Sequence, residues 1–179
     1  MTNRKKLVTE MGRIDRDAFA QSQKLPLVVV LDNVRSLHNV GSVFRTSDAF
    51  RVECIMLCGI TATPPSAEIH KTALGAEDVV DWKYYESTMD AVEALRGEGY
   101  RIYSIELCEG SIALQDFVTA PGERYAVVLG NEVKGVQQDV VDASDGAIEI
   151  PQFGTKHSLN VSVTAGMVIW EFAKKLGLV

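Results

Sequence analysis

The chain has 179 residues, 46% of them hydrophobic and 23% charged, which is typical of one globular domain with a sizeable core. The longest strongly apolar run, near residues 25–31, is far too short to cross a bilayer, so no membrane span is expected. The mixed charges of the N-terminus exclude a secretory signal and predict a cytoplasmic protein, and the net charge of −6 argues against a uniformly basic surface.

Predicted strands and helices alternate along the chain. Four apolar residues at helical spacing predict an amphipathic helix over residues 3–20. The other predicted elements are strands at 27–31, 53–57, 79–85, 100–107, 125–129 and 147–150, and helices at 40–50, 66–74, 88–96 and 158–176. This alternation indicates an α/β fold with a mostly parallel sheet and flanking helices.

The carboxyl ends of the strands are the expected ligand-binding edge of such a sheet, so the loops after Leu31, Leu107, Leu129 and Ile150 are candidate sites. The loops do not match the common nucleotide-binding motifs. No GxGxxG sequence opens a helix, and residues 130–135 have the glycine spacing of a P-loop without its Lys-Ser/Thr pair. Scattered histidines and the absence of a CxxC pair predict no metal site, and Cys54, Cys58 and Cys108 are expected to be buried thiols.

The loop and helix at residues 31–50 carry two candidates with competing interpretations. Asn39 is either an ordinary helix N-cap or a site residue. Arg45 either pairs with Asp48 on the helix surface or presents its guanidinium to a phosphate, and Gly41 is expected to leave space beside it.

Two later loops carry further candidates. Gly130 follows a strand and permits close approach of a ligand to the backbone, while Glu132 is either a site carboxylate or a solvated turn residue. Ser158 is well placed to cap the last helix, whereas Asn160, in the expected first turn, is less readily explained by capping.

Three segments together resemble the signature motifs of the SpoU/TrmH type of RNA ribose methyltransferase, in the SPOUT superfamily. The motifs are N-x-G-x-x-x-R at residues 39–45, G-N-E-x-x-G at 130–135 and I-P-x-x-G-x-x-x-S-L-N-V-S-V at 150–163. Residues 70–76 also resemble a segment of that family. The resemblance covers roughly residues 25–177, which leaves residues 1–24 as an N-terminal helical extension and residues 25–179 as the methyltransferase domain.

The resemblance implies a C-terminal deep trefoil knot that binds S-adenosyl-L-methionine, held largely by backbone groups. The residues that it assigns to the cofactor are Leu107, Leu129, Gly130, Ile150, Ser158 and Leu159. It also implies a homodimer through helices of the knot region. Ser162 and Gly166, four residues apart in the last helix, would allow close approach of a partner helix or equally tight packing within one subunit.

The implied reaction is methyl transfer to a ribose 2'-hydroxyl of RNA. Arg45 is expected to act as the base or to position a phosphate, and the second role is favoured because guanidinium groups stay protonated. Asn39, Glu132, Ser158 and Asn160 would shape the site.

RNA contacts are expected from Arg45, Lys134, Lys156 and His157, while the basic residues between positions 4 and 16 either touch RNA or form a solvated helix face. No separate RNA-binding domain is predicted, which favours tRNA over rRNA as substrate. Two alternatives remain open: a catalytically silent RNA-binding member of the same fold, and a small-molecule-binding Rossmann-like enzyme.

Overall fold

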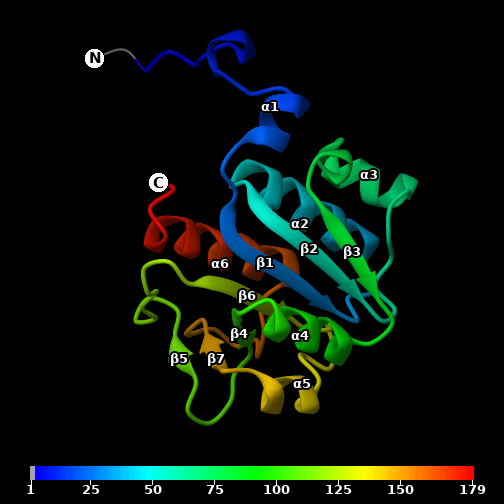
Figure 1. Ribbon diagram of the computed structural model, residues 1–179, viewed down its shortest axis with the longest axis vertical. Coiled ribbons are helices and arrows are strands. Elements are labelled where there is room, and N and C mark those ends of the chain that lie inside the picture. Colours follow the sequence, from blue (N-terminus) through cyan, green and yellow to red (C-terminus); the bar gives the residue numbers. More distant parts are fainter. Residues whose placement is uncertain (1–2) are drawn as a thin grey trace.

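The computed structural model describes residues 3–179, which form a sheet with helices on both faces (Figure 1). All seven strands are parallel, in the order β3-β2-β1-β6-β4-β7-β5. They are β1 (Leu25–Asp32), β2 (Val52–Cys58), β3 (Trp82–Tyr85), β4 (Tyr100–Ile105), β5 (Ile112–Ala113), β6 (Arg124–Leu129) and β7 (Gly146–Glu149). The predicted α/β class with a parallel sheet is therefore confirmed.

The helices cover the sheet in two layers. They are α1 (Arg16–Gln21), α2 (Leu37–Ala49), α3 (Ala67–Ala73), α4 (Thr88–Gly97), α5 (Gln138–Ala143) and α6 (Val161–Lys175), with short 3-10 helices η1 (Val8–Glu10) and η2 (Ala76–Asp78). Helices α2, α3 and α6 pack with one buried cluster, and α4 and α5 pack with the other. No helix in residues 3–179 is long and apolar enough to span a membrane.

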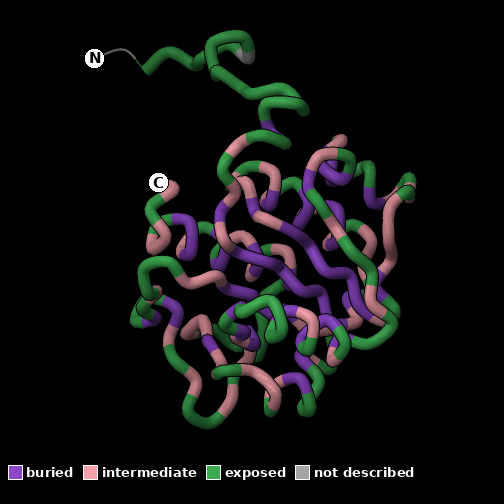
Figure 2. Tube along the Cα trace, in the orientation of Figure 1, coloured by how far each residue is buried: buried purple, intermediate pink, exposed green. Residues whose placement is uncertain are grey.

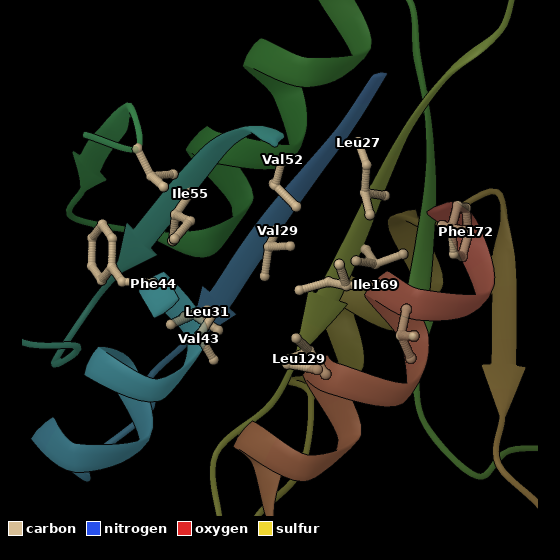
Figure 3. Close-up of a cluster of buried hydrophobic side chains, with 14 of the residues drawn as sticks. Leu27, Val29, Leu31, Val43, Phe44, Val52, Ile55, Leu129, Ile169 and Phe172 are labelled. Carbon is tan, nitrogen blue, oxygen red and sulfur yellow. The ribbon is translucent and has the colours of Figure 1, made fainter. Parts of the chain in front are cut away.

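Strand β1 is apolar on both sides because it lies in the middle of the sheet between the two helix layers (Figure 2). Leu27, Val29 and Leu31 point toward the layer of α2 and α6, as Figure 3 shows, while Val28 and Val30 belong to the opposite cluster. This two-sided burial explains the continuous apolar run that predicted a strand.

The cysteines of β2 are buried, as expected from their spacing on one face of a strand. Burial raises the pKa of the Cys54 thiol to about 11 and that of Cys58 to about 12. Both therefore behave as apolar core groups. Cys108 is only half-buried, so the expectation of burial is less well met there.

The predicted helix over residues 3–20 is wrong. Only η1 and the six-residue α1 are helical in this segment, separated by Gly12 at a φ of +59°. The carboxylate of Asp15 accepts a hydrogen bond from the backbone N–H of Ala18 at 2.8 Å and so starts α1 as a new helix. Phe19 is buried and attaches α1 to the main core.

Two predicted strand boundaries also shift. Strand β4 ends at Ile105, so Leu107 lies in the following loop and is exposed. Strand β3 begins at Trp82, because η2 occupies the residues just before position 79.

Candidate active site

A cavity of about 650 Å³ lies beyond the carboxyl ends of β4, β6 and β7. These strands are neighbours in the sheet, so the loops that follow them meet at one edge. All six residues predicted to hold the cofactor line this cavity: Leu107, Leu129, Gly130, Ile150, Ser158 and Leu159. Side chains from three loops separated in sequence thus surround one space.

The loop after β6 is folded tightly back on itself at the cavity. A Cβ on Gly130 would overlap the backbone of Gly135 and Val136, so only glycine fits. Asn131 fixes the turn, because its Oδ1 accepts hydrogen bonds from the backbone N–H groups of Val133 (2.9 Å) and Lys134 (3.1 Å). The glycine in this motif is therefore required by the backbone path itself.

Glu132 connects this loop to the start of α2. Its carboxylate accepts hydrogen bonds from the backbone N–H groups of Arg35 and Ser36, each at 3.0 Å, and from Asn39 Nδ2 at 3.1 Å. Burial opposes ionisation, but these hydrogen bonds outweigh it and lower the pKa of Glu132. The carboxylate is thus ionised and has defined partners, unlike a solvated turn residue.

Asn39 joins all three motifs. Besides donating to Glu132, its Oδ1 accepts a hydrogen bond from Asn160 Nδ2 at 3.2 Å. The N-cap interpretation of Asn39 is wrong, because Ser36 caps α2 and Asn39 lies in the first turn. The network brings residues 39, 132 and 160 to one edge of the cavity.

The capping role expected for Ser158 belongs to Asn160. Helix α6 begins at Val161, and Asn160 Oδ1 accepts hydrogen bonds from the backbone N–H groups of Ser162 (2.9 Å) and Val163 (3.4 Å). Ser158 lies two residues earlier, in the exposed loop that lines the cavity. It is therefore placed to contact a ligand rather than to start the helix.

Arg45 lies two turns into α2, about 9 Å along the helix axis from Asn39. It is exposed, and within residues 3–179 its guanidinium has no hydrogen bond or ion pair, so the predicted alternative of a pair with Asp48 is wrong. Gly41 does not make space for it, because a Cβ there would overlap Thr72 and Ile69 of α3. That glycine serves close helix packing.

Only two of the three basic loop residues predicted to contact RNA lie at the cavity. Lys134 and His157 line the cavity, whereas Lys156 is exposed in the same loop as His157 without lining it. All lie on loops, which suits contact with a large external ligand.

Sequence reasoning missed two carboxylates that hold the loops in place. Glu106 accepts hydrogen bonds from the backbone N–H groups of Leu107 and Val136, each at 3.0 Å, and so joins the loops after β4 and β6. Asp32 is buried and accepts from Thr88 Oγ1 at 2.7 Å and from Gln137. The available signal was a carboxylate placed at the end of an apolar strand.

Comparison with known proteins adds to this geometry. The model described as the SpoU rRNA Methylase family matches residues 26–170. The chain belongs to this family. Its predicted family resemblance is therefore confirmed.

Individual relatives agree with the family assignment. The chain is 31% identical to a putative TrmH family tRNA/rRNA methyltransferase of Staphylococcus haemolyticus, over 94% of this chain and 68% of that protein. It is 29% identical to the tRNA (guanosine(18)-2'-O)-methyltransferase of Thermus thermophilus, over 91% of this chain and 82% of that one. The chain spans 65% to 68% of the length of several curated relatives.

A solved structure gives the same result for the fold. The AdoMet-bound rRNA methyltransferase from Sinorhizobium meliloti matches with a TM-score of 0.78 at 27% identity, covering 90% of this chain and 60% of that one. SpoU methyltransferases use S-adenosylmethionine, so the predicted cofactor is confirmed at the level of the family.

Proposed function

We propose that this protein transfers a methyl group from S-adenosylmethionine to a ribose 2'-hydroxyl of RNA. The observation that carries the proposal is the network in which Asn39 joins Glu132 and Asn160 beside the cavity. It brings polar groups from all three motifs to the edge of a space lined by the residues expected to hold the cofactor. A methyl donor and an acceptor hydroxyl can meet at such an edge.

The cavity suits the cofactor. Its volume falls within the range of roughly 300–1,000 Å³ that is usual for small-molecule sites. Leu129, Ile150 and Leu159 offer apolar surface, and Gly130 lines the cavity where the loop after β6 folds back on itself. In this proposal the chain supplies shape and backbone groups, and the bound cofactor supplies the methyl group.

The proposed reaction is a single displacement. S-adenosylmethionine, held in the cavity, would supply the methyl group: the ribose 2'-oxygen would bond to the methyl carbon as the carbon–sulfur bond broke to leave the neutral thioether, and the hydroxyl proton would pass to solvent water. Arg45 is proposed to hold the phosphate beside the reacting ribose, because its guanidinium is exposed and has no partner in residues 3–179. Ser158, Glu132 and Asn39 shape the position of the acceptor.

The substrate is proposed to be tRNA in preference to rRNA. The name of the Thermus relative, a tRNA guanosine 2'-O-methyltransferase covered over 82% of its length, favours this choice and the ribose as acceptor. The name of the RlmB relative from Vibrio parahaemolyticus, a 23S rRNA guanosine 2'-O-methyltransferase, is the reason to test rRNA as well. Lys134, Lys156 and His157 are proposed as RNA contacts, and a cytoplasmic location is part of the same proposal.

A homodimer through α6 is proposed as the active form. Three large apolar residues on this helix are exposed at i, i+4 and i+7: Val163 (51%), Met167 (45%) and Trp170 (47%). A Cβ on Gly166 would meet nothing within 4 Å, which favours approach of a partner over packing inside one subunit. Such a stripe is suited to burial against a second copy.

The C-terminal trefoil knot and the division into an extension (1–24) and a methyltransferase domain (25–179) also remain proposals. The family match begins at residue 26, which supports the boundary. Residues 1 and 2 of the extension lie outside the described residues. Helix α6 follows β7 and packs on α2 (Figure 1).

The test is a tritium-transfer assay with purified protein, labelled S-adenosylmethionine, and unmodified bulk tRNA or rRNA. We expect label in tRNA as an alkali-resistant 2'-O-methyl nucleotide. Label in rRNA alone would change the substrate, and alkali-labile label would overturn the ribose as acceptor. Cofactor binding without label in either pool would indicate a silent RNA-binding protein.

A further inference from the structure

Phe153 is the most exposed large apolar side chain in the described part of the chain, at 97%. It lies in the loop between β7 and α6, and both Gln152 before it and His157 after it line the cavity. Exposing a whole phenyl ring to water is unfavourable, and a Cβ on the neighbouring Gly154 would meet nothing within 4 Å. The ring thus stands in open space beside the site.

The surrounding loop carries positive charge on an acidic chain. Residues 150–160 contain Lys156 and His157 and no carboxylate, although the whole chain has a net charge of −6. Lys134 adds a third basic side chain on the facing loop of the cavity. The cavity lining itself also holds Glu106, Glu132 and Glu149, so the basic character belongs to the outer loop that carries Phe153. An aromatic ring beside basic side chains is a combination that binds single-stranded nucleic acid, in which bases stack and phosphates pair with cations.

Methyl transfer adds a geometric requirement. A ribose whose 2'-hydroxyl reaches the cavity brings its base along through one glycosidic bond. A nucleotide placed in this way leaves its stack, and the unstacked base needs a new flat surface. Phe153 is the exposed aromatic residue of the loops that line the cavity.

We propose that Phe153 forms the nucleobase subsite, stacking on the base of the target nucleotide or of its immediate neighbour. The inference rests on the proposed function and names the part of the RNA that this loop recognises. Stacking tolerates any base, so Phe153 contributes affinity and positioning rather than selection of one base. The competing occupant of the ring is a second copy of this chain.

The experiment compares wild type with Phe153→Ala, Phe153→Leu and Phe153→Trp in filter binding to unmodified bulk tRNA and rRNA. For the better-bound pool we expect Phe153→Ala and Phe153→Leu to weaken binding by roughly 5- to 150-fold, and Phe153→Trp to stay within a few fold of wild type. Val118→Ala is the matched control, because Val118 is 82% exposed and lies outside the site. Cofactor affinity, measured by calorimetry, should be unchanged in every variant.

Three other results for the variants would overturn the inference. Unchanged RNA binding in Phe153→Ala would exclude stacking, and full rescue by Leu would replace stacking with general apolar contact. A variant that becomes monomeric by light scattering would assign the ring to the subunit interface. RNA binding is measured independently of methyl transfer. A wild-type protein that binds RNA but transfers no methyl group would therefore refute the proposed function, while the effect of the Phe153 variants on RNA binding could still be compared. A wild type that binds neither pool would refute both.

Discussion

Asn160 Nδ2 donates a hydrogen bond of 3.2 Å to Asn39 Oδ1 across 121 positions of sequence. The same Asn160 caps α6 through its Oδ1, and Asn39 passes the connection on to Glu132. Two amides therefore fix the relative position of the start of α2, the start of α6 and the loop after β6. Any change in this pair is transmitted to the edge of the cavity.

Asn39→Ala removes both side-chain hydrogen bonds and leaves Glu132 and Asn160 each without one partner. We expect methyl transfer to fall by roughly tenfold, because each of the two lost hydrogen bonds contributes about 0.5–1.5 kcal/mol and the site edge loosens. Circular dichroism should show an unchanged fold. Ser42→Ala in the same helix is the control, since its hydroxyl bonds only to the His38 carbonyl. Equal rates for both variants would contradict the role of Asn39.

Arg45→Ala is expected to lower methyl transfer by roughly 10- to 150-fold with cofactor affinity unchanged, as for loss of one charged hydrogen-bonding contact. The reason is that Arg45 is exposed on α2 and does not line the cavity, so its loss removes a substrate contact alone. Transfer assays and calorimetry measure the two quantities separately. Arg45→Lys, which keeps the charge but loses bidentate geometry, should fall between wild type and Ala. Near-normal turnover in Arg45→Ala would show that Arg45 is not a functional residue of the site.

Gly130→Ala places a Cβ against the backbone of Gly135 and Val136, which cannot yield as a side chain can. We expect cofactor affinity to fall by roughly 5- to 150-fold and thermal stability to drop, as for overpacked sites. Gly97→Ala is the matched control, because a Cβ there meets nothing within 4 Å and Gly97 ends α4. Calorimetry that finds equal affinity in both variants would show that the loop relaxes freely.

Much of the fold can be predicted from the sequence, because the patterns that indicate strands and helices lie within short segments of the chain. A buried parallel strand reads as a continuous apolar run, as residues 27–31 do, and the alternation of elements gives the class. The N-terminal segment fails for a physical reason: Gly12 takes a positive φ and Asp15 starts a new helix, so a four-residue apolar pattern does not extend across them. Strand β5 has two residues and carries no periodicity to detect.

The sequence predicts which residues belong to the site, but it does not predict the structural role of each one. The motifs indicate Asn39, Glu132 and Asn160, but both caps differ from the prediction: Ser36 caps α2 in place of Asn39, and Asn160 caps α6 in place of Ser158, because polar residues two or three positions apart are equally plausible caps. Glu106 and Asp32 each stand at the end of an apolar strand, but their partners, Val136 and Gln137, are distant in sequence, so no local pattern predicts the contacts. The sequence pattern places Gly41 beside Arg45, one turn away, whereas in the structure Gly41 packs against α3, which is distant in sequence.

Glu132 makes the stability of the loop depend on pH. Burial opposes its ionisation, but the hydrogen bonds from Arg35, Ser36 and Asn39 lower its folded-state pKa. Its stabilising contribution is therefore complete above the ordinary value of 4.5 and is lost as the pH falls through the lowered pKa. The effect is small because the residue is exposed. Thermal unfolding of wild type and Glu132→Gln should differ at neutral pH and converge as the pH falls below 4.5 and through the lowered pKa. A difference that is constant with pH would contradict this.

Met167→Glu tests the proposed dimer through α6. It places a charge in the middle of the exposed stripe between Val163 and Trp170, where burial against a second copy would leave the carboxylate unpaired. We expect light scattering to show a dimer for wild type and a 19.6 kDa monomer for the variant, with unchanged circular dichroism. Lys83→Glu is the control, because Lys83 is exposed on the edge strand β3 and not on α6. If wild type is itself a monomer that methylates RNA, the stripe has another partner and the dimer is refuted.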